Sequence, residues 1–167
     1  MQNKVKIGGV FKVWCYDSEG KLKWFDTAKN LVVNEGLNHL LDVLLTGGTQ
    51  VTTWYVGLTD GTPTVAAADT MSSHSGWTEI TAYSESTRPE YVETRSGQTV
   101  SNSASKASFS INASTTSGGA FLTSDSTKGG TSGTLLCAAA FTAGNKSLSN
   151  GDTLNVQYDF SAADDGA

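Results

Sequence analysis

The feature that most constrains the fold of this chain is a single change of hydrophobic period between Asn30 and Leu58. Over NLVVNEGLNHLLDVLLTGGTQVTTWYVGL, a strand-like run gives way to leucines at helical spacing and then returns to strand. Apolar residues three and four apart favour an amphipathic helix, whereas alternation favours a strand with one wet face. Since the rest of the chain alternates, the sequence predicts a sheet protein with one helix.

We expect that helix at about residues 35–46. Asn34 can cap it, Glu35 suits the positive end of the helix dipole, and Gly47–Gly48 ends it. Four leucines at spacings of three and four form one apolar stripe: Leu37, Leu40, Leu41 and Leu44. Such a stripe predicts burial against a sheet, in which case Leu41→Ala would cost about 2–5 kcal/mol.

Short alternating runs occupy most of the remaining chain. Gly9–Tyr16 and Lys21–Phe25 flank the turn-forming DSEG and predict a β-hairpin. The clearest run is Asp152–Ser161, whose apolar and polar residues alternate strictly after the turn signal Asn150-Gly151. Further strands are expected at Ala28–Val33, Thr53–Leu58, Trp77–Ala82, Glu90–Arg95, Ala104–Ala113, Gly119–Thr123 and Thr134–Thr142.

These elements predict a mainly β fold, a single-domain antiparallel β-sandwich or jelly-roll-like fold with one short α-helix. A chain of 167 residues is about one domain. We assign residues 9–161 to the β-rich domain, residues 1–8 to a flexible N-terminal arm and residues 162–167 to an acidic C-terminal tail. Two segments, Thr62–Gly76 and Ser124–Gly133, are expected to be polar surface loops that bury little.

Composition argues against several classes of partner. The net charge of −5 disfavours nucleic acid, because binding to phosphates depends on clustered Lys and Arg. No stretch approaches 18 continuous apolar residues, which argues against a membrane partner. Cys15 and Cys137 lie in strand-like runs without an export signal, so we expect two buried free thiols and folding in a cytoplasm.

The sequence offers few groups for catalysis or metal binding. His39 and Asp42 lie three residues apart on the helix, but no nucleophile motif accompanies them, and we interpret them as a solvent-facing pair. The cysteines and histidines lack the spacing of a metal site. Asp159, Asp164 and Asp165 are interpreted as part of a charged tail rather than a calcium site. We therefore predict no enzyme activity, no metal and no cofactor.

A carbohydrate-binding module remains open as an alternative. Trp77, Tyr83 and Tyr91 lie near Glu79 and Glu85 in the sequence, and together they would form an aromatic and polar strip for stacking on sugars. The two carboxylates would otherwise suit glycosidase chemistry, if they faced one another across a cleft. Charges on the wet faces of strands are the simpler interpretation of both glutamates.

Several stretches together form an unusual string. They are VWCYDSEGKLKW, KNLVVNEGLNHLLDVLLTGG, TTWYVGLTDGTPTVAAADTM, WTEITAYSESTRPEYVE, SNSASKASFSINAS, GAFLTS, GTLLCAAAF and LSNGDTLNVQYDF. This string resembles a family of small virion structural proteins from tailed bacteriophages, and the resemblance covers nearly the whole chain. Its most specific part is N-x-V-V-x-E-G-x-N followed by a Leu-rich helix, a Gly pair and WYVGL, which is a fold signature without a functional residue.

The resemblance implies a subunit that decorates or cements a capsid. Such a subunit would bind outside the shell of the major capsid protein as a homodimer or homotrimer, and it would be located in the virion after synthesis in the bacterial host cytoplasm. A tail or head–tail component is the alternative within this class.

The candidate interface residues are Lys4, Lys6, Ile7, Trp24 and Trp77. Trp24 and Trp77 are included because Trp is enriched at interfaces. Trp14 and Trp54 lie inside apolar strands and are expected in the core.

Overall fold

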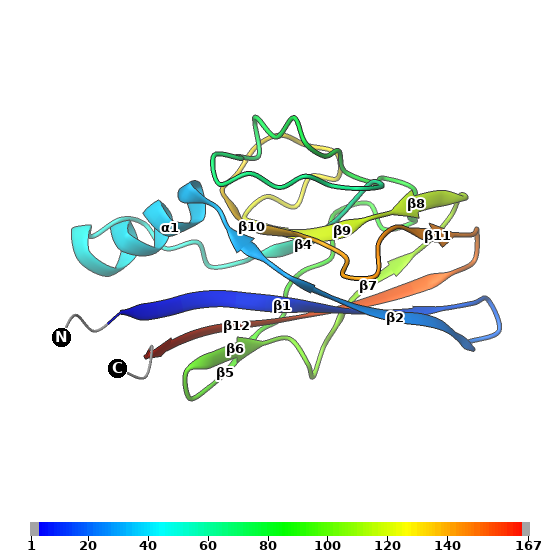
Figure 1. Ribbon diagram of the computed structural model, residues 1–167, viewed down its shortest axis with the longest axis horizontal. Helices are drawn as coiled ribbons and strands as arrows, with labels where there is room; N and C mark the ends of the chain where they lie inside the picture. Colours follow the sequence, from blue (N-terminus) through cyan, green and yellow to red (C-terminus); the bar gives the residue numbers. More distant parts are fainter. Residues whose placement is uncertain (1–3, 165–167) are drawn as a thin grey trace.

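The computed structural model describes residues 4–164 and consists mainly of two facing antiparallel sheets (Figure 1). The first sheet has the order β2 (Leu22–Lys29), β1 (Val5–Tyr16), β12 (Thr153–Asp164), β6 (Thr99–Ser101) and β5 (Thr94–Ser96), and β7 (Ala107–Ser110) also pairs with β12. The second has the order β3 (Leu31–Val32), β10 (Leu135–Ala140), β9 (Gly119–Thr123) and β4 (Tyr55–Thr59). A small ladder joins β8 (Thr115–Ser117) to β11 (Lys146–Leu148). The expected mainly β, sandwich-like fold is confirmed.

The two ends of the chain are paired with each other. β1 and β12 form an antiparallel ladder that runs from Val5 opposite Asp164 to Tyr16 opposite Thr153. The prediction of a flexible arm over residues 1–8 and a tail over 162–167 is therefore wrong for Val5–Gly8 and for Ala162–Asp164. Both segments are strand, because each satisfies backbone groups of the other. Residues 1–3 and 165–167 lie outside the described residues.

The main core lies between the sheets and follows the alternation of their strands. On β1, Phe11, Val13 and Cys15 point inward and are fully buried. Trp14 must then point outward, where its ring lies 5.0 Å from that of Phe25, so its expected place in the core is wrong. The two cysteines are free and buried as predicted, and burial raises the pKa of each thiol to about 12.

A second, smaller core lies on the other face of the second sheet. There Met71 and Trp77 pack against Phe121, Leu135 and Ala138. The prediction that Thr62–Gly76 buries little is therefore wrong, since this loop closes over an apolar face of the sheet. The expected strand at Trp77–Ala82 is reduced to the bridge between Glu79 and Thr59, and the expected strand at Glu90–Arg95 to the bridge between Glu90 and Tyr55 together with the start of β5.

Arg88 holds this loop layer in place. Its guanidinium is fully buried and donates twice to the Glu79 carboxylate, at 2.9 and 2.7 Å. It also donates to the carbonyl oxygens of Asp125 and Gly130, at 2.8 and 2.7 Å. Arg88 thus connects its own loop to the segment Ser124–Gly133. The residues of that segment are half-buried or exposed, as expected from the sequence.

Arg88→Ala should destabilise the fold by about 3–5 kcal/mol, because Glu79 and two loop carbonyls would lose their buried partner. Arg95→Ala is the matched control, since Arg95 is exposed and donates only to the Gly97 carbonyl; it should change stability by less than about 0.5 kcal/mol. Denaturant unfolding measures both. Equal midpoints for the two variants would contradict the role of Arg88.

The helix forms where the sequence predicts it, as α1 (Asn34–Leu41) continuing into a π-helical turn, η1 (Asp42–Thr46). It ends at Gly47, whose φ of 74° is left-handed, as expected for a helix stop. The expected cap is wrong: Val33 occupies the cap position and no side chain caps the helix. Glu35 instead accepts a hydrogen bond from the Leu135 backbone N–H at 2.7 Å, which ties the helix to β10.

Gly36 is the contact point between helix and sheet. It is the buried residue of α1, and a Cβ added there would lie 2.3 Å from the Leu136 carbonyl oxygen. The helix backbone therefore rests directly on β10, and no side chain separates them.

Gly36→Ala should lower stability by about 1–3 kcal/mol, because the new methyl would push α1 off β10. This loss should exceed the gain of about 1 kcal/mol that Ala brings within a helix. Asn38→Ala provides the control at an exposed position of the same helix, where only propensity changes. Thermal melts that show Gly36→Ala to be as stable as Asn38→Ala would sink this interpretation.

Candidate interaction surface

The leucine stripe of the helix faces outward. Leu41 is 54% exposed and Leu44 77% exposed, and Leu37 is exposed as well; only Leu40 packs against the core. The prediction that the stripe covers a sheet is therefore wrong, and with it the large cost expected for Leu41→Ala. The reason is that α1 crosses the end of the sandwich and contacts it through Gly36 (Figure 1).

The π-helical turn adds a further leucine to this stripe. The wider turn of η1 follows Leu41 directly, and it leaves none of its own residues buried. Leu45 is 73% exposed beside Leu44. π-turns interrupt the regular helix and occur frequently at functional sites. This end of the helix is therefore a candidate contact surface.

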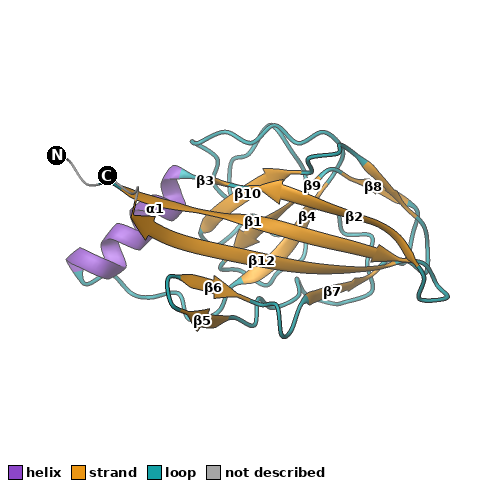
Figure 2. Cartoon of the chain, turned by 60° about the horizontal axis from the view of Figure 1, so that its bottom comes forward, coloured by secondary structure: helices purple, strands orange, loops and turns teal. Residues whose placement is uncertain are grey.

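The ends of β1 and β12 extend the apolar surface onto the first sheet. Figure 2 shows the two strands running side by side toward the helix. Val5 and Ile7 alternate in step with Phe11, so they lie on the face that forms the core farther along the strand. At this end the second sheet no longer covers that face, and Val5 is 67% exposed.

A groove of about 460 Å³ separates helix and strands, with Ile7, Leu40, Leu44, Trp54 and Phe160 among its lining residues. Ile7 on the strand and Leu44 on the helix thus line the same groove, and we call the exposed apolar side chains of these two elements the apolar end. We define it by the exposed side chains of Val5, Ile7, Leu37, Leu41, Leu44 and Leu45.

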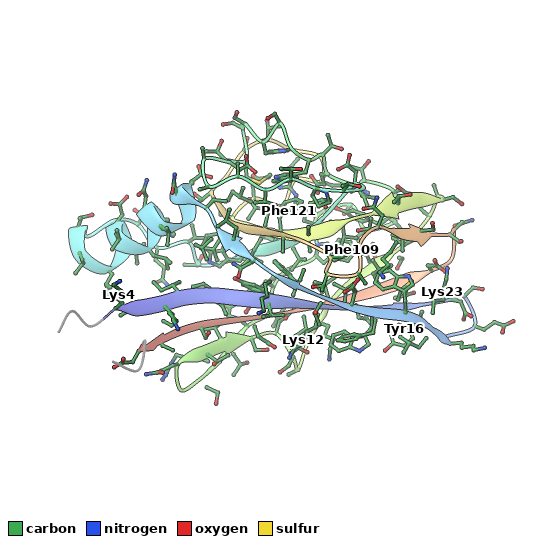
Figure 3. The ribbon with its side chains drawn as sticks, in the orientation of Figure 1. Lys4, Lys12, Tyr16, Lys23, Phe109 and Phe121 are labelled. Carbon is green, nitrogen blue, oxygen red and sulfur yellow. The ribbon has the colours of Figure 1, made fainter. Side chains whose placement is uncertain are left out.

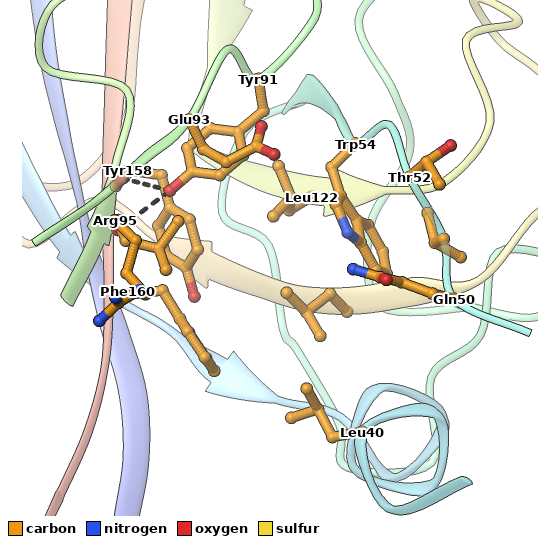
Figure 4. Close-up of a pocket in the computed structure, with 13 residues that line it drawn as sticks. Leu40, Gln50, Thr52, Trp54, Tyr91, Glu93, Arg95, Leu122, Tyr158 and Phe160 are labelled. Carbon is orange, nitrogen blue, oxygen red and sulfur yellow. Dashed lines mark hydrogen bonds between the residues drawn. The ribbon is translucent and has the colours of Figure 1, made fainter. Parts of the chain in front are cut away.

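The groove continues inward as a cavity of about 480 Å³ between the sheets (Figure 4). The two share Leu40, Gln50, Val51, Trp54 and Phe160. Tyr91 forms part of the wall and donates its hydroxyl hydrogen to the carbonyl oxygens of Tyr158, at 2.9 Å, and Val100, at 3.1 Å. Burial raises the pKa of Tyr91, so the phenol stays neutral. Apolar and aromatic side chains make up most of the remaining wall, together with Glu93 and Arg95.

Three of the five candidate interface residues lie at this end. Lys4, Lys6 and Ile7 are exposed on or next to β1, and Figure 3 shows Lys4 beside the helix. Trp24 lies on β2 next to Lys23, which Figure 3 places at the opposite end of the molecule. Trp24 is half-buried, and its ring lies 6.0 Å from that of Phe141.

Trp77 is removed from the candidate interface, because it is only 3% exposed. Its indole N–H donates to the Asp69 carboxylate at 3.0 Å, and its ring stacks on that of His74 at 3.8 Å. Tyr83 and Tyr91 are buried too. The aromatic strip proposed for sugar binding is therefore not on the surface, since these rings fill the two cores.

The remaining polar candidates have structural partners. Glu79 is paired with Arg88, and Glu85 accepts hydrogen bonds from the Ser110 backbone N–H. The His39 ring meets the edge of Trp54 at 5.7 Å, while the Asp42 carboxylate accepts from the Thr46 hydroxyl. Among residues 4–164, no group of three or more His, Cys, Asp and Glu side chains is placed to hold a metal ion. Within the same range, no helix has the length and apolar character needed to span a membrane.

No protein-family model matches the chain, and no curated protein is significantly similar to it. The feature that bears on function is therefore the apolar end itself. Exposed apolar patches of this kind mark protein–protein or membrane interaction sites or ligand-binding grooves.

The apolar end could contribute to association on the same scale as association costs. The exposed fractions of its six side chains together equal about 3.5 whole side chains. Their burial would contribute roughly 5–10 kcal/mol per copy, whereas association costs about 4–15 kcal/mol. A partner surface of similar apolar character would roughly double the apolar contribution, whereas a polar partner would add little to it.

Proposed function

We propose that this chain is a structural subunit of a tailed-phage virion, which binds the outside of the capsid as a decoration or cement protein and stabilises the mature head. The observation that carries the proposal is the apolar end, an exposed leucine surface that requires a protein partner. In a decorated capsid that partner is a neighbouring subunit or the major capsid protein.

Two further features support a structural role. Glu79, a carboxylate that the sequence offers for chemistry, is paired with Arg88, and His74 stacks on Trp77 and bonds to its backbone carbonyl. The resemblance to small phage virion proteins covers the same strands and helix that build the sandwich. An assembly subunit needs this kind of rigid body with a defined contact surface.

The subunit acts by differential binding. A cement protein that binds the expanded shell more tightly than the unexpanded one shifts the equilibrium toward the mature state. Because one capsid presents many equivalent sites, modest contacts repeated over the lattice produce a large total stabilisation. Such a mechanism requires contact residues but neither nucleophile nor cofactor.

Copy number in purified particles tests the proposal. Particles carrying the parent protein should contain it at hundreds of copies, in a fixed ratio to the major capsid protein, as measured by quantitative mass spectrometry and cryo-EM. Leu44→Glu should reduce occupancy strongly, because it places a charge in the apolar end. Leu22→Glu is the matched control, an exposed leucine on β2 outside the apolar end, and should leave occupancy unchanged.

A few copies confined to the tail would overturn the capsid role and favour a tail or head–tail component instead. Complete absence from particles would overturn both virion roles.

A further inference from the structure

We propose that the apolar end binds a second copy of this chain and forms a two-fold symmetric dimer. This dimer deepens the proposed function. It rests on that proposal only in one respect, that the apolar end makes contacts between subunits. The dimer would be the unit that is added to the lattice.

The area of the surface favours a second copy. About 3.5 whole side chains correspond to roughly 200–400 Å² of apolar surface per copy. When two such surfaces meet, the apolar area doubles, and a polar rim brings the total to roughly 700–1,300 Å². This range includes the size of the smaller specific interfaces. A partner with a polar surface would bury only half of this apolar area, because it would contribute no apolar side chains of its own.

The strand edge beside the leucines points to the same occupant. The ladder with β2 covers β1 only from Val10 to Tyr16, and the Gly9 backbone bonds to Asn30. Over Val5–Gly8, no strand of the described chain pairs with β1 on the side opposite β12. An open edge binds another strand readily, and the same edge from a second copy fits it in antiparallel orientation.

Two-fold symmetry explains why the exposed leucines and the open edge of β1 lie at the same end of the molecule. In a two-fold dimer each contact is made twice, so the leucine stripes of the two helices pack on one another next to the two β1 edges. The chain carries a net charge of −5, which opposes association elsewhere on its surface. At this end of the molecule Lys4 and Lys6 lie next to and on β1, Asp164 lies opposite Val5 and Asp42 begins η1, so both signs of charge are present.

Sedimentation of the purified full-length chain tests the dimer without any virion particle. The parent should be a dimer at about 100 μM with a dissociation constant in the micromolar range. Leu44→Glu should raise that constant by roughly 50-fold or more, since the change occurs in both copies. Leu22→Glu should leave it unchanged, and circular dichroism should show that both variants are folded.

Cysteine cross-linking provides an independent test. The two native thiols, Cys15 and Cys137, are buried, so a new surface cysteine is the reactive one. Under mild oxidation Leu45→Cys should form a dimer linked by a disulfide, in which two thiols lose two electrons and two protons to the added oxidant. Leu22→Cys should remain monomeric on a non-reducing gel.

A parent that remains monomeric at about 100 μM, or that forms a trimer, would overturn the inference. A dimer that dissociates with Leu22→Glu but persists with Leu44→Glu would overturn it as well. A dimer that depends on Leu44 but is absent from particles would leave this inference standing and refute the proposed virion role.

Discussion

The antiparallel ladder between β1 and β12 is the contact on which the rest of the structure depends. It joins the two ends of the described chain over the full length of both strands, and β2, β6 and β7 all attach to it. Its inner face supplies Phe11, Val156 and Tyr158 to the main core. Because the ladder runs past the second sheet to Val5, it also creates the exposed apolar strip opposite the helix.

Local pattern was enough to predict much of this fold. Strict alternation predicts β12 as far as Ser161 but not its end at Asp164, and the change of period predicts the helix and its stop at Gly47. The inward positions of Cys15 and Cys137 followed from the same reasoning. Long-range pairing was harder to anticipate. The local alternation around Val5 and Ile7 does not show that these residues lie opposite Asp164 and Ala162, respectively. A ladder between distant parts of the chain is decided by tertiary contact.

The helix shows where periodicity misleads. A leucine stripe predicts an apolar environment without specifying whether it belongs to the same molecule. Two local features of the sequence point to the observed helix orientation. Gly36 has no side chain and so permits close backbone contact with the sheet. Leu44 and Leu45 are adjacent, whereas a single narrow apolar stripe would contain only one of them. The role of Arg88 does not show in the sequence for a related reason: although Glu79 is 9 residues away, Asp125 and Gly130 are 37 and 42 residues away. A lone arginine in a polar loop resembles a solvated one.

Amide hydrogen exchange as a function of protein concentration tests whether a partner copy covers the apolar end. We expect the Ile7, Leu44 and Leu45 amides to exchange more slowly as concentration rises, while the Trp24 amide at the other end is unaffected. Exchange rates at Ile7, Leu44 and Leu45 that do not depend on concentration would contradict it.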